Sequence, residues 1–261
     1  MRRAVRSGFF RHGLVGVVLA GLLLGCAALP PQSPPSLPGV ARSVPALEKK
    51  DGGVFLRKHA ACLQQTQRGD VELLFLGDSI TEGWAKQPAL WQKHYGAWRT
   101  ANCGVGGDRV EHVLWRLDHG LLAQTRPRVV VLMIGTNNSA SQGADYIVAG
   151  IQEILATLQA GSPQSRVLLL GVLPRGPRRN ADGSMDDGLR RMDVIRAVNA
   201  RLAQLDDGQR LRYLDIGERF LVEGRIPAEL MPDQLHPGAR GYAIWADAMQ
   251  GLLDEMMAQT P

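Results

Sequence analysis

The stretch FLGDSITEGW, residues 75–84, decides how the chain can fold. It continues an apolar, strand-like run that stops at Gly77 and leaves Asp78 and Ser79 side by side. One interpretation is an ordinary strand-to-helix turn, because glycine permits a tight backbone and both Asp and Ser favour helix starts. The other places Ser79 at the carboxyl end of a strand, where open α/β sheets bind their ligands. These few residues do not separate the two interpretations, so the rest of the chain has to.

Strand-like and helix-like segments alternate along the rest of the chain. The run RVVVLMI, residues 128–134, is continuous and rich in β-branched residues, which is typical of a parallel strand covered on both faces. Between residues 110 and 117, apolar residues recur at i, i+3, i+4 and i+7, the spacing of one face of a helix. By the same criteria we expect strands at 71–76, 98–103, 128–134, 166–170 and 211–215, and helices at 54–65, 89–95, 110–117, 147–158, 192–205 and after Pro237.

This alternation predicts an α/β protein: a flavodoxin-like three-layer α/β/α sandwich around a mostly parallel sheet of about five strands. Right-handed crossovers bring the carboxyl ends of all parallel strands to one edge of such a sheet. Polar, glycine-containing motifs follow the first three strands: GDS (77–79), GVGGD (104–108) and GTNN (135–138). A fourth motif, PDQLHP (232–237), lies near the carboxyl terminus. We therefore expect the four motifs to meet on one rim.

The four motifs together contain the groups that acyl transfer needs. A serine hydroxyl is a weak nucleophile until a base takes its proton, and that base needs a third group to orient it. Ser79, His236 and Asp233 can fill these three places. Negative charge that develops on a reacting carbonyl oxygen calls for preorganised donors. The backbone N–H groups of Ser79 and Gly107 and the side-chain amide of Asn137 are available on the same rim.

Each of these residues also has an ordinary structural interpretation. Ser79 alone could be a helix cap, Asn137 a turn residue, and the Asp and His of the last motif could bond only within their own loop. The joint arrangement favours the catalytic interpretation over several separate coincidences. We interpret Asp108 and Asn138 as residues that brace their loops, and leave them out of the catalytic set.

Other candidate sites carry weaker signals. The Gly/Pro-rich loop 174–188 has three arginines that could contact an anionic substrate or remain solvated: Arg175, Arg178 and Arg179. The three histidines between residues 94 and 119 lack ligand spacing to Cys or acidic partners, so we expect no metal site. The run GVGG lacks the third glycine of a dinucleotide-binding fingerprint, and we expect no organic cofactor.

The strings GDSI, NCGVGGD, GTNN and DQLH occur in the order and approximate spacing of the four sequence blocks of the SGNH (GDSL-type) hydrolases. Over residues 55–255 the chain resembles that superfamily, and within it most of all the catalytic subunits of platelet-activating-factor acetylhydrolases. The resemblance implies a nucleophile, two oxyanion donors and the rest of a triad, in this order: Ser79, Gly107 and Asn137, and Asp233 with His236.

The same resemblance implies a serine esterase that cleaves small acyl esters, acetyl esters above all, through an acyl-enzyme. The substrate would be a glycan or lipid ester. Two alternatives stay open: a lipase or thioesterase of longer acyl chains, and a non-catalytic lipoprotein of the same fold that binds envelope glycan. The nucleophile elbow of the α/β-hydrolases, G-x-S-x-G, does not fit, because Thr81 stands where its last glycine should be. The sequence does not indicate an oligomeric state.

The first residues indicate export. Residues 1–25 contain four arginines and no acid, and their apolar run, 14–25, is too short to cross a bilayer as a helix. This is the shape of a secretory signal. The run ends in LLGC, which resembles a bacterial lipobox, so we expect Cys26 to be lipidated; an ordinary signal peptide and a buried amino-terminal helix are the alternatives. Ala27 follows the cysteine and favours an anchor in the outer membrane that faces the periplasm.

Prolines are dense after the lipobox and indicate an extended spacer. We therefore divide the chain into a lipoprotein signal peptide (1–25), a lipidated cysteine with a Pro-rich tether (26–49) and an SGNH hydrolase domain (50–261). The net charge is +5, but the amino-terminal arginines supply most of it, so we expect no nucleic-acid partner for the nearly neutral remainder. Cys62 and Cys103 could form a disulfide in an oxidising compartment or remain two buried thiols.

Overall fold

The computed structural model describes residues 53–180, 182–186 and 188–259. The predicted signal peptide (1–25), the lipidated Cys26 and the tether (26–49) lie outside this range, as does the domain boundary at residue 50. Within the described part, none of the helices has the length and apolar character that crossing a membrane requires.

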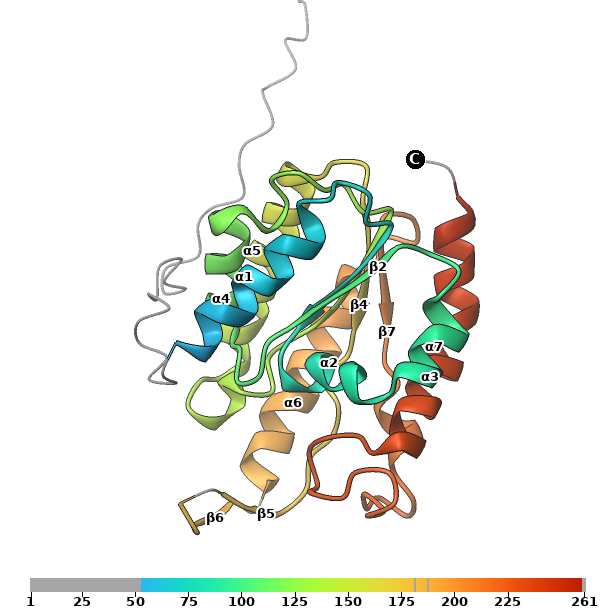
Figure 1. Ribbon diagram of the computed structural model, residues 1–261. Coiled ribbons are helices and arrows are strands. Elements are labelled where there is room, and N and C mark those ends of the chain that lie inside the picture. Colours follow the sequence, from blue (N-terminus) through green and yellow to red (C-terminus); the bar gives the residue numbers. More distant parts are fainter. Residues whose placement is uncertain (1–52, 181, 187, 260–261) are drawn as a thin grey trace, which may run out of the picture. The chain divides into compact units, whose positions relative to one another are not determined.

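A five-stranded parallel sheet forms the centre of the described chain (Figure 1). Its strand order, β2-β1-β3-β4-β7, is the flavodoxin-like order and confirms the predicted fold class. The order reverses between β1 and β3, which makes a switch point at their carboxyl ends. The strands are β1 (Leu73–Gly77), β2 (Thr100–Gly104), β3 (Val129–Met133), β4 (Arg166–Leu170) and β7 (Leu211–Leu214).

Helices cover both faces of the sheet, which makes the predicted three layers (Figure 1). Side chains alternate along β1, so Leu74 and Leu76 join the core under α1, α4, α5 and α6, whereas Leu73 and Phe75 join the core under α3 and α7. The helices are α1 (Val54–Thr66), α2 (Ser79–Glu82), α3 (Pro88–Tyr95), α4 (Val110–Arg116), α5 (Ala144–Gly161), α6 (Leu189–Leu202) and α7 (Ala239–Ala258).

Short 3₁₀ or π turns and one hairpin complete the described elements. The turns are η2 (Gly83–Lys86), η3 (Leu117–Leu121), η4 (Asn138–Ala140), η5 (Ala203–Leu205) and η6 (Gly217–Phe220). The hairpin pairs β5 (Arg178–Arg179) with β6 (Met185–Asp186) in antiparallel fashion. It lies in the segment that the sequence predicts to be a loop, so that expectation was incomplete: two-residue strands are too short for a period-two pattern to reveal.

Two glycines, at the ends of β1 and β2, allow the chain to turn tightly into α2 after the first strand. A Cβ atom on Gly77 would overlap the hydroxyl of Thr81 and the carbonyl oxygen of Met133. A Cβ atom on Gly104 would overlap the backbone of Glu82. Because neither residue has a side chain, the short helix α2 folds back tightly over the ends of β1 and β2. Both interpretations of the opening motif therefore hold: it is a strand-to-helix turn, and it places Ser79 at the carboxyl edge of the sheet.

A disulfide joins Cys62 in α1 to Cys103 in β2, with their Cα atoms 5.4 Å apart. This resolves the pairing that the sequence left open. The bridge closes a sequence separation of 41 residues, and the enclosed segment contains all of β1 and α2. The loop that the disulfide closes therefore contains Ser79.

Candidate active site

Three of the predicted site residues form a continuous series of hydrogen bonds. The Oγ atom of Ser79 lies 2.9 Å from Nε2 of His236. The Nδ1 atom of the same imidazole lies 2.7 Å from Oδ2 of Asp233. With Nδ1–H donating to the carboxylate, Nε2 is the acceptor that faces the serine hydroxyl. The geometry therefore allows His236 to take a proton from Ser79 while Asp233 fixes the orientation of the ring.

Asp78 and Tyr242 hold the turn that carries Ser79 through bonds to the backbone of the next residue, Ile80. Asp78 is buried and caps α2, because its Oδ1 atom accepts a hydrogen bond from the backbone N–H of Ile80 at 2.9 Å. The hydroxyl of Tyr242, in α7, donates to the carbonyl oxygen of Ile80 at 2.7 Å. Burial raises the pKa of Tyr242, and the nearby charge of Asp78 adds to the effect, so the phenol stays protonated and remains a donor.

A tight turn brings Asp233 back to His236. Its Oδ1 atom accepts the backbone N–H groups of Leu235 at 3.2 Å and of His236 at 2.7 Å. Gln234 between them has a φ of 62°, in the left-handed region. Burial acts to raise the pKa of Asp233, but hydrogen bonds from His236 and the charges of His236 and Arg178 outweigh it and hold the pKa below its ordinary value. The lowered pKa favours the ionised carboxylate of Asp233, which accepts the hydrogen bond from Nδ1–H of His236.

Asn137 and Gly107 lie in the loops that follow the neighbouring strands β3 and β2. The side-chain nitrogen of Asn137 donates to the carbonyl oxygen of Asp108 at 2.8 Å, and it lies 3.5 Å from Oδ2 of Asp78. The second of these distances is at the limit of a hydrogen bond, so one amide hydrogen is only loosely held. Gly107 is exposed and has a φ of 75°, which suits a residue without Cβ. The contacts of Asn137 thus link the loop that carries Gly107 to the turn that carries Ser79.

The interpretation of Asp108 and Asn138 as loop braces is confirmed. Asp108 and Arg116 are both fully buried, and their charged atoms lie 3.1 Å apart. Arg116 also donates to the carbonyl oxygen of Cys103 at 2.8 Å. Burial lowers the pKa of Arg116, while the charge of Asp108 works against that shift. Asn138 accepts the backbone N–H of Val110 at 3.1 Å and so fixes the start of α4.

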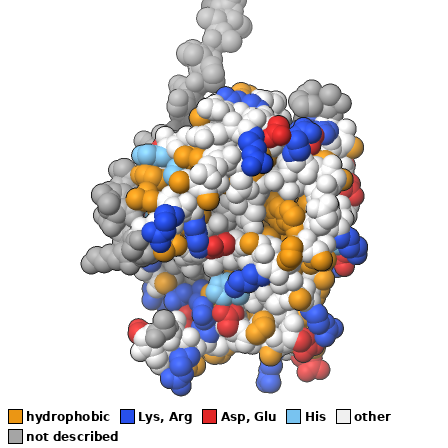
Figure 2. All heavy atoms as spheres, in the orientation of Figure 1, with side chains coloured by type: hydrophobic (Ala, Val, Ile, Leu, Met, Phe, Trp, Pro, Cys, Tyr) orange, Lys and Arg blue, Asp and Glu red, His pale blue; other side chains and the backbone are white. Residues whose placement is uncertain are grey.

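An open cleft of about 570 Å³ gives access to Ser79 and His236. Figure 2 shows basic, acidic and histidine side chains gathered on one face of the molecule, below the position that α2 has in Figure 1. Within the cleft, Lys58 forms an ion pair with Glu82, whose other carboxylate oxygen accepts the backbone N–H of Gly106 at 2.7 Å. The residues that line the cleft are Lys58, Ser79, Glu82, Gly83, Ala85, Lys86, Gln87, Pro232, Asp233, His236, Pro237, Gly238 and Tyr242.

The three arginines of the segment 174–188 make different contacts. Arg175 is buried and pairs with Asp186 at 3.0 Å, and burial lowers its pKa to about 10. Arg179 is exposed and donates to the carbonyl oxygen of Gly183. Arg178 instead lies 3.4 Å from Asp233, a contact that sequence reasoning missed. No spacing or periodicity relates two positions so far apart in the chain, so the sequence held no signal for it.

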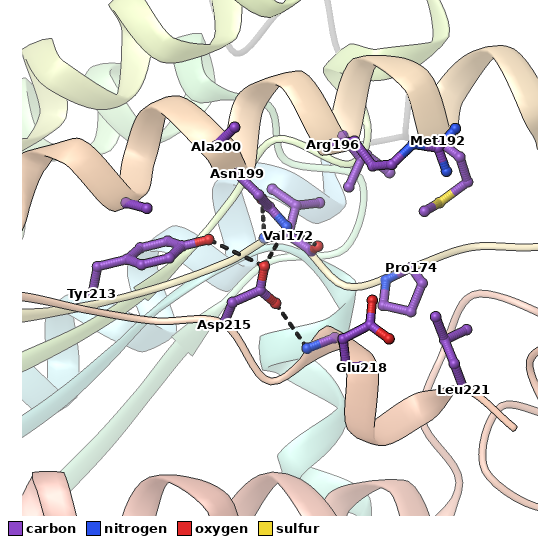
Figure 3. Close-up of a pocket in the computed structure, with 13 residues that line it drawn as sticks. Val172, Pro174, Met192, Arg196, Asn199, Ala200, Tyr213, Asp215, Glu218 and Leu221 are labelled. Carbon is purple, nitrogen blue, oxygen red and sulfur yellow. Dashed lines mark hydrogen bonds between the residues drawn. The ribbon is translucent and has the colours of Figure 1, made fainter. Parts of the chain in front are cut away.

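A second pocket, of about 410 Å³, lies between α6 and the carboxyl end of β7 (Figure 3). Its central carboxylate, Asp215, accepts hydrogen bonds from the hydroxyl of Tyr213, the amide of Asn199 and the backbone N–H of Gly217. Through these bonds, the carboxylate of Asp215 links α6 to the carboxyl end of β7. Neither serine nor histidine lines this pocket. Among the residues that the structure describes, no group of three or more His, Cys, Asp or Glu side chains is placed to hold a metal ion.

The chain is similar to known proteins over most of its length. Platelet-activating factor acetylhydrolase IB subunit alpha1 of Rattus norvegicus is 32% identical over 220 residues, which cover 84% of this chain and 90% of that protein. Two solved structures share the fold. A GDSL-like lipase from Bacteroides thetaiotaomicron has a TM-score of 0.61 at 20% identity and covers 77% of this chain and 97% of its own. A carbohydrate acetylesterase family member from Sinorhizobium meliloti has a TM-score of 0.57 at 17% identity, with coverage of 72% and 100%.

The family comparison covers most of the described domain. Residues 75–244 match the GDSL-like lipase/acylhydrolase family. The matched range begins inside β1, two residues before Gly77, and it ends in α7, so it contains all four sequence motifs and the hydrogen-bonded series of Ser79, His236 and Asp233. The chain therefore belongs to the GDSL-like lipase/acylhydrolase family and is an ester hydrolase.

Proposed function

We propose that this chain hydrolyses small acyl esters, acetyl esters above all, through an acyl-enzyme on Ser79. The observation that carries the proposal is the series Ser79–His236–Asp233, with distances of 2.9 and 2.7 Å, open to one cleft. Nε2 of His236 takes the hydroxyl proton as Oγ attacks the ester carbonyl carbon, and it then gives that proton to the departing alcohol. Water repeats the sequence on the acyl-enzyme and releases the acid.

The oxyanion that forms in each half-reaction needs donors that are in place beforehand. We assign this role to the backbone N–H groups of Ser79 and Gly107 and to the amide of Asn137. The contacts of Asn137 support the assignment, since the bond to Asp108 fixes the planar amide while its second hydrogen makes only a long contact of 3.5 Å with Asp78. The buried pair of Asp108 with Arg116 keeps the loop that carries Gly107 rigid, which limits reorganisation as charge develops.

The choice of a small acyl group draws support from similar proteins. The 32% identical relative is named an acetylhydrolase, and one structure of the same fold belongs to a carbohydrate acetylesterase family. A lipase or thioesterase of longer chains is the alternative, because the cleft is open rather than closed around a short acyl group. A non-catalytic glycan-binding protein has less support, because a binding protein does not need a serine, a histidine and an aspartate that are joined by hydrogen bonds.

The experiment is a series of nitrophenyl esters, from acetate to dodecanoate, with the purified chain and its Ser79→Ala variant. We expect kcat/KM to be highest for acetate and to fall with chain length, and we expect Ser79→Ala to lose nearly all activity. A maximum at longer chains would favour the lipase alternative. Equal hydrolysis by parent and variant would contradict the role of Ser79, and no hydrolysis by either would favour the binding protein.

We also propose that the chain is held at the bacterial cell envelope, on the outer membrane facing the periplasm, by a lipid on Cys26. The lipobox-like LLGC string and the proline-rich segment after it support this, because they give a lipid attachment site and a spacer for the hydrolase domain. Cys26→Ser should abolish labelling by a fatty acid and leave an unprocessed precursor in mass spectra. Equal labelling of parent and variant would contradict the anchor.

A further inference from the structure

Arg178 lies against the same carboxylate oxygen that holds His236. Its Nη2 atom is 3.4 Å from Oδ2 of Asp233, and Nδ1 of His236 is 2.7 Å from that oxygen. The other oxygen, Oδ1, already accepts two backbone N–H groups of the turn. The negative charge of Oδ2 is therefore shared between an imidazole and a permanent cation.

The hairpin that carries Arg178 is fastened to the loop that carries Asp233. The backbone N–H of Gly176 donates to the carbonyl oxygen of Gln234 at 2.9 Å. Arg175 anchors the base of the hairpin, because it contacts Asp186 at 3.0 Å and the hydroxyl of Thr136 at 3.3 Å. These bonds hold the hairpin beside the Asp233 loop, so the backbone position of Arg178 does not depend on the Asp233 contact alone.

The other titratable side chains that line the cleft are paired, neutral or exposed to solvent. The titratable side chains that line the cleft with Ser79, Asp233 and His236 are Lys58, Glu82, Lys86 and Tyr242. Lys58 and Glu82 pair with each other, so their fields largely cancel. Tyr242 is neutral because burial raises its pKa. Lys86 ends the turn η2 and is exposed to solvent, where its charge is screened. Arg178 is the cation that contacts the carboxylate directly.

We propose that Arg178 is a positioning residue that acts through Asp233 to extend the activity of the Ser79–His236 pair to lower pH. The inference rests on the proposed function. Asp233 stabilises the positive charge that His236 gains with a proton, and a second cation on the same oxygen weakens that stabilisation. The imidazole therefore keeps its neutral, base-competent form further into the acidic range. Arg178 also restrains the rotation of the carboxylate.

The test is the acid limb of the pH profile of kcat/KM for nitrophenyl acetate, between about pH 5 and about pH 9. Two unit charges about 6 Å apart in a water-like dielectric shift a titration by about half a pH unit. Arg178→Gln should therefore move the acid limb to higher pH by about half a unit, and Arg178→Glu by about one unit. Arg178→Lys should stay close to the parent, because it keeps the charge.

Arg179→Gln is the matched control, because it removes one charge from the same hairpin without touching Asp233. Its profile should overlay that of the parent. A purely structural role for Arg178 would lower kcat at every pH and leave the midpoint of the limb unchanged. That result, or a Glu variant whose midpoint matches the parent, would overturn the inference. If Arg178→Gln melts below the assay temperature, the Lys and Glu variants supply the same comparison of charge.

Ser79→Ala separates this inference from the proposed function on which it rests. If Ser79→Ala hydrolyses the ester as well as the parent, the proposed triad is wrong whatever the Arg178 variants do. If Ser79→Ala is inactive and the acid limbs of the Arg178 series coincide, the triad stands and only the role of Arg178 is rejected.

Discussion

The buried pair of Asp108 and Arg116 provides a sharp test of what holds the site together. Asp108→Asn keeps the shape of the side chain and one neutral hydrogen bond, but it removes the negative charge. Arg116 is then a fully buried cation that retains the carbonyl oxygen of Cys103 and an amide as partners. We expect the variant to be destabilised, because a buried charge without a counter-charge is far from water and poorly compensated.

The separation of the two groups sets the size of the effect. At 3.1 Å and an effective dielectric of about 20, the attraction is about 5 kcal/mol. Removing one partner of a buried pair typically costs about 3 to 5 kcal/mol. Because the asparagine keeps a neutral hydrogen bond, we expect the free energy of unfolding to fall by about 3 kcal/mol. In a domain of this size the melting temperature should then fall by about 6 to 12 °C.

Urea unfolding measures the change, with circular dichroism and tryptophan fluorescence as two probes of the same transition. The midpoint should fall while the slope with urea stays constant. Arg116→Met is the partner single variant, and the Asp108→Asn/Arg116→Met double variant should lose much less than the sum of the two single losses. The reasoning is refuted if Asp108→Asn lies within about 1 kcal/mol of the parent, or if the two single losses simply add.

Three other outcomes follow from the structure. Asn137→Ala should lower kcat roughly 10²–10³-fold with little change in KM, and a folded variant with near-parental kcat would remove Asn137 from the site. Replacing both Cys62 and Cys103 with Ala should lower the free energy of unfolding by about 4 kcal/mol, measured in urea, and an unchanged midpoint would contradict it. Burial raises the pKa of all four tyrosines above the ordinary value of about 10. The contribution of the neutral tyrosines to the free energy of unfolding is therefore present below about pH 10 and should be lost as the pH rises above it. Tyrosinate absorbance should rise together with unfolding, not before it. These tyrosines are Tyr95, Tyr146, Tyr213 and Tyr242.

The fold was predictable because its signals are local and strong. The continuous run at 128–134 has to be a strand covered on both sides, and β3 is buried throughout. Once the strands are parallel and the crossovers right-handed, the carboxyl ends share one edge. That single rule brings Ser79 and Asn137 together, since they follow β1 and β3, which pair directly. Strand boundaries were less accurate, because hydrogen-bond pairing with a neighbour, not apolar content, decides where a strand begins.

The contacts that surround the site were not predictable in the same way. The contact between Arg178 and Asp233 depends on how a short hairpin docks on a distant loop, and neither segment has a periodic pattern. Predicting the disulfide requires the distance between α1 and β2, which the spacing of residues along the sequence does not give. Asp108 was predicted to brace its loop, but its partner Arg116 was not predicted. From the sequence alone, a buried arginine in a helix cannot be told from a solvent-exposed one.

The order of the strands along the chain separates the making of the sheet from the completion of the site. Every strand of the main sheet precedes residue 215, whereas His236, the base that we propose for Ser79, comes 157 residues after it, on the segment that leads into α7. A chain that is cut or stalled before residue 232 would carry the whole sheet and a serine with no proton acceptor. Under the proposed mechanism, hydrolysis is then the last property that the chain acquires. A chromogenic ester would report, in a single reading, that translation passed residue 236 and that His236 lies against Ser79.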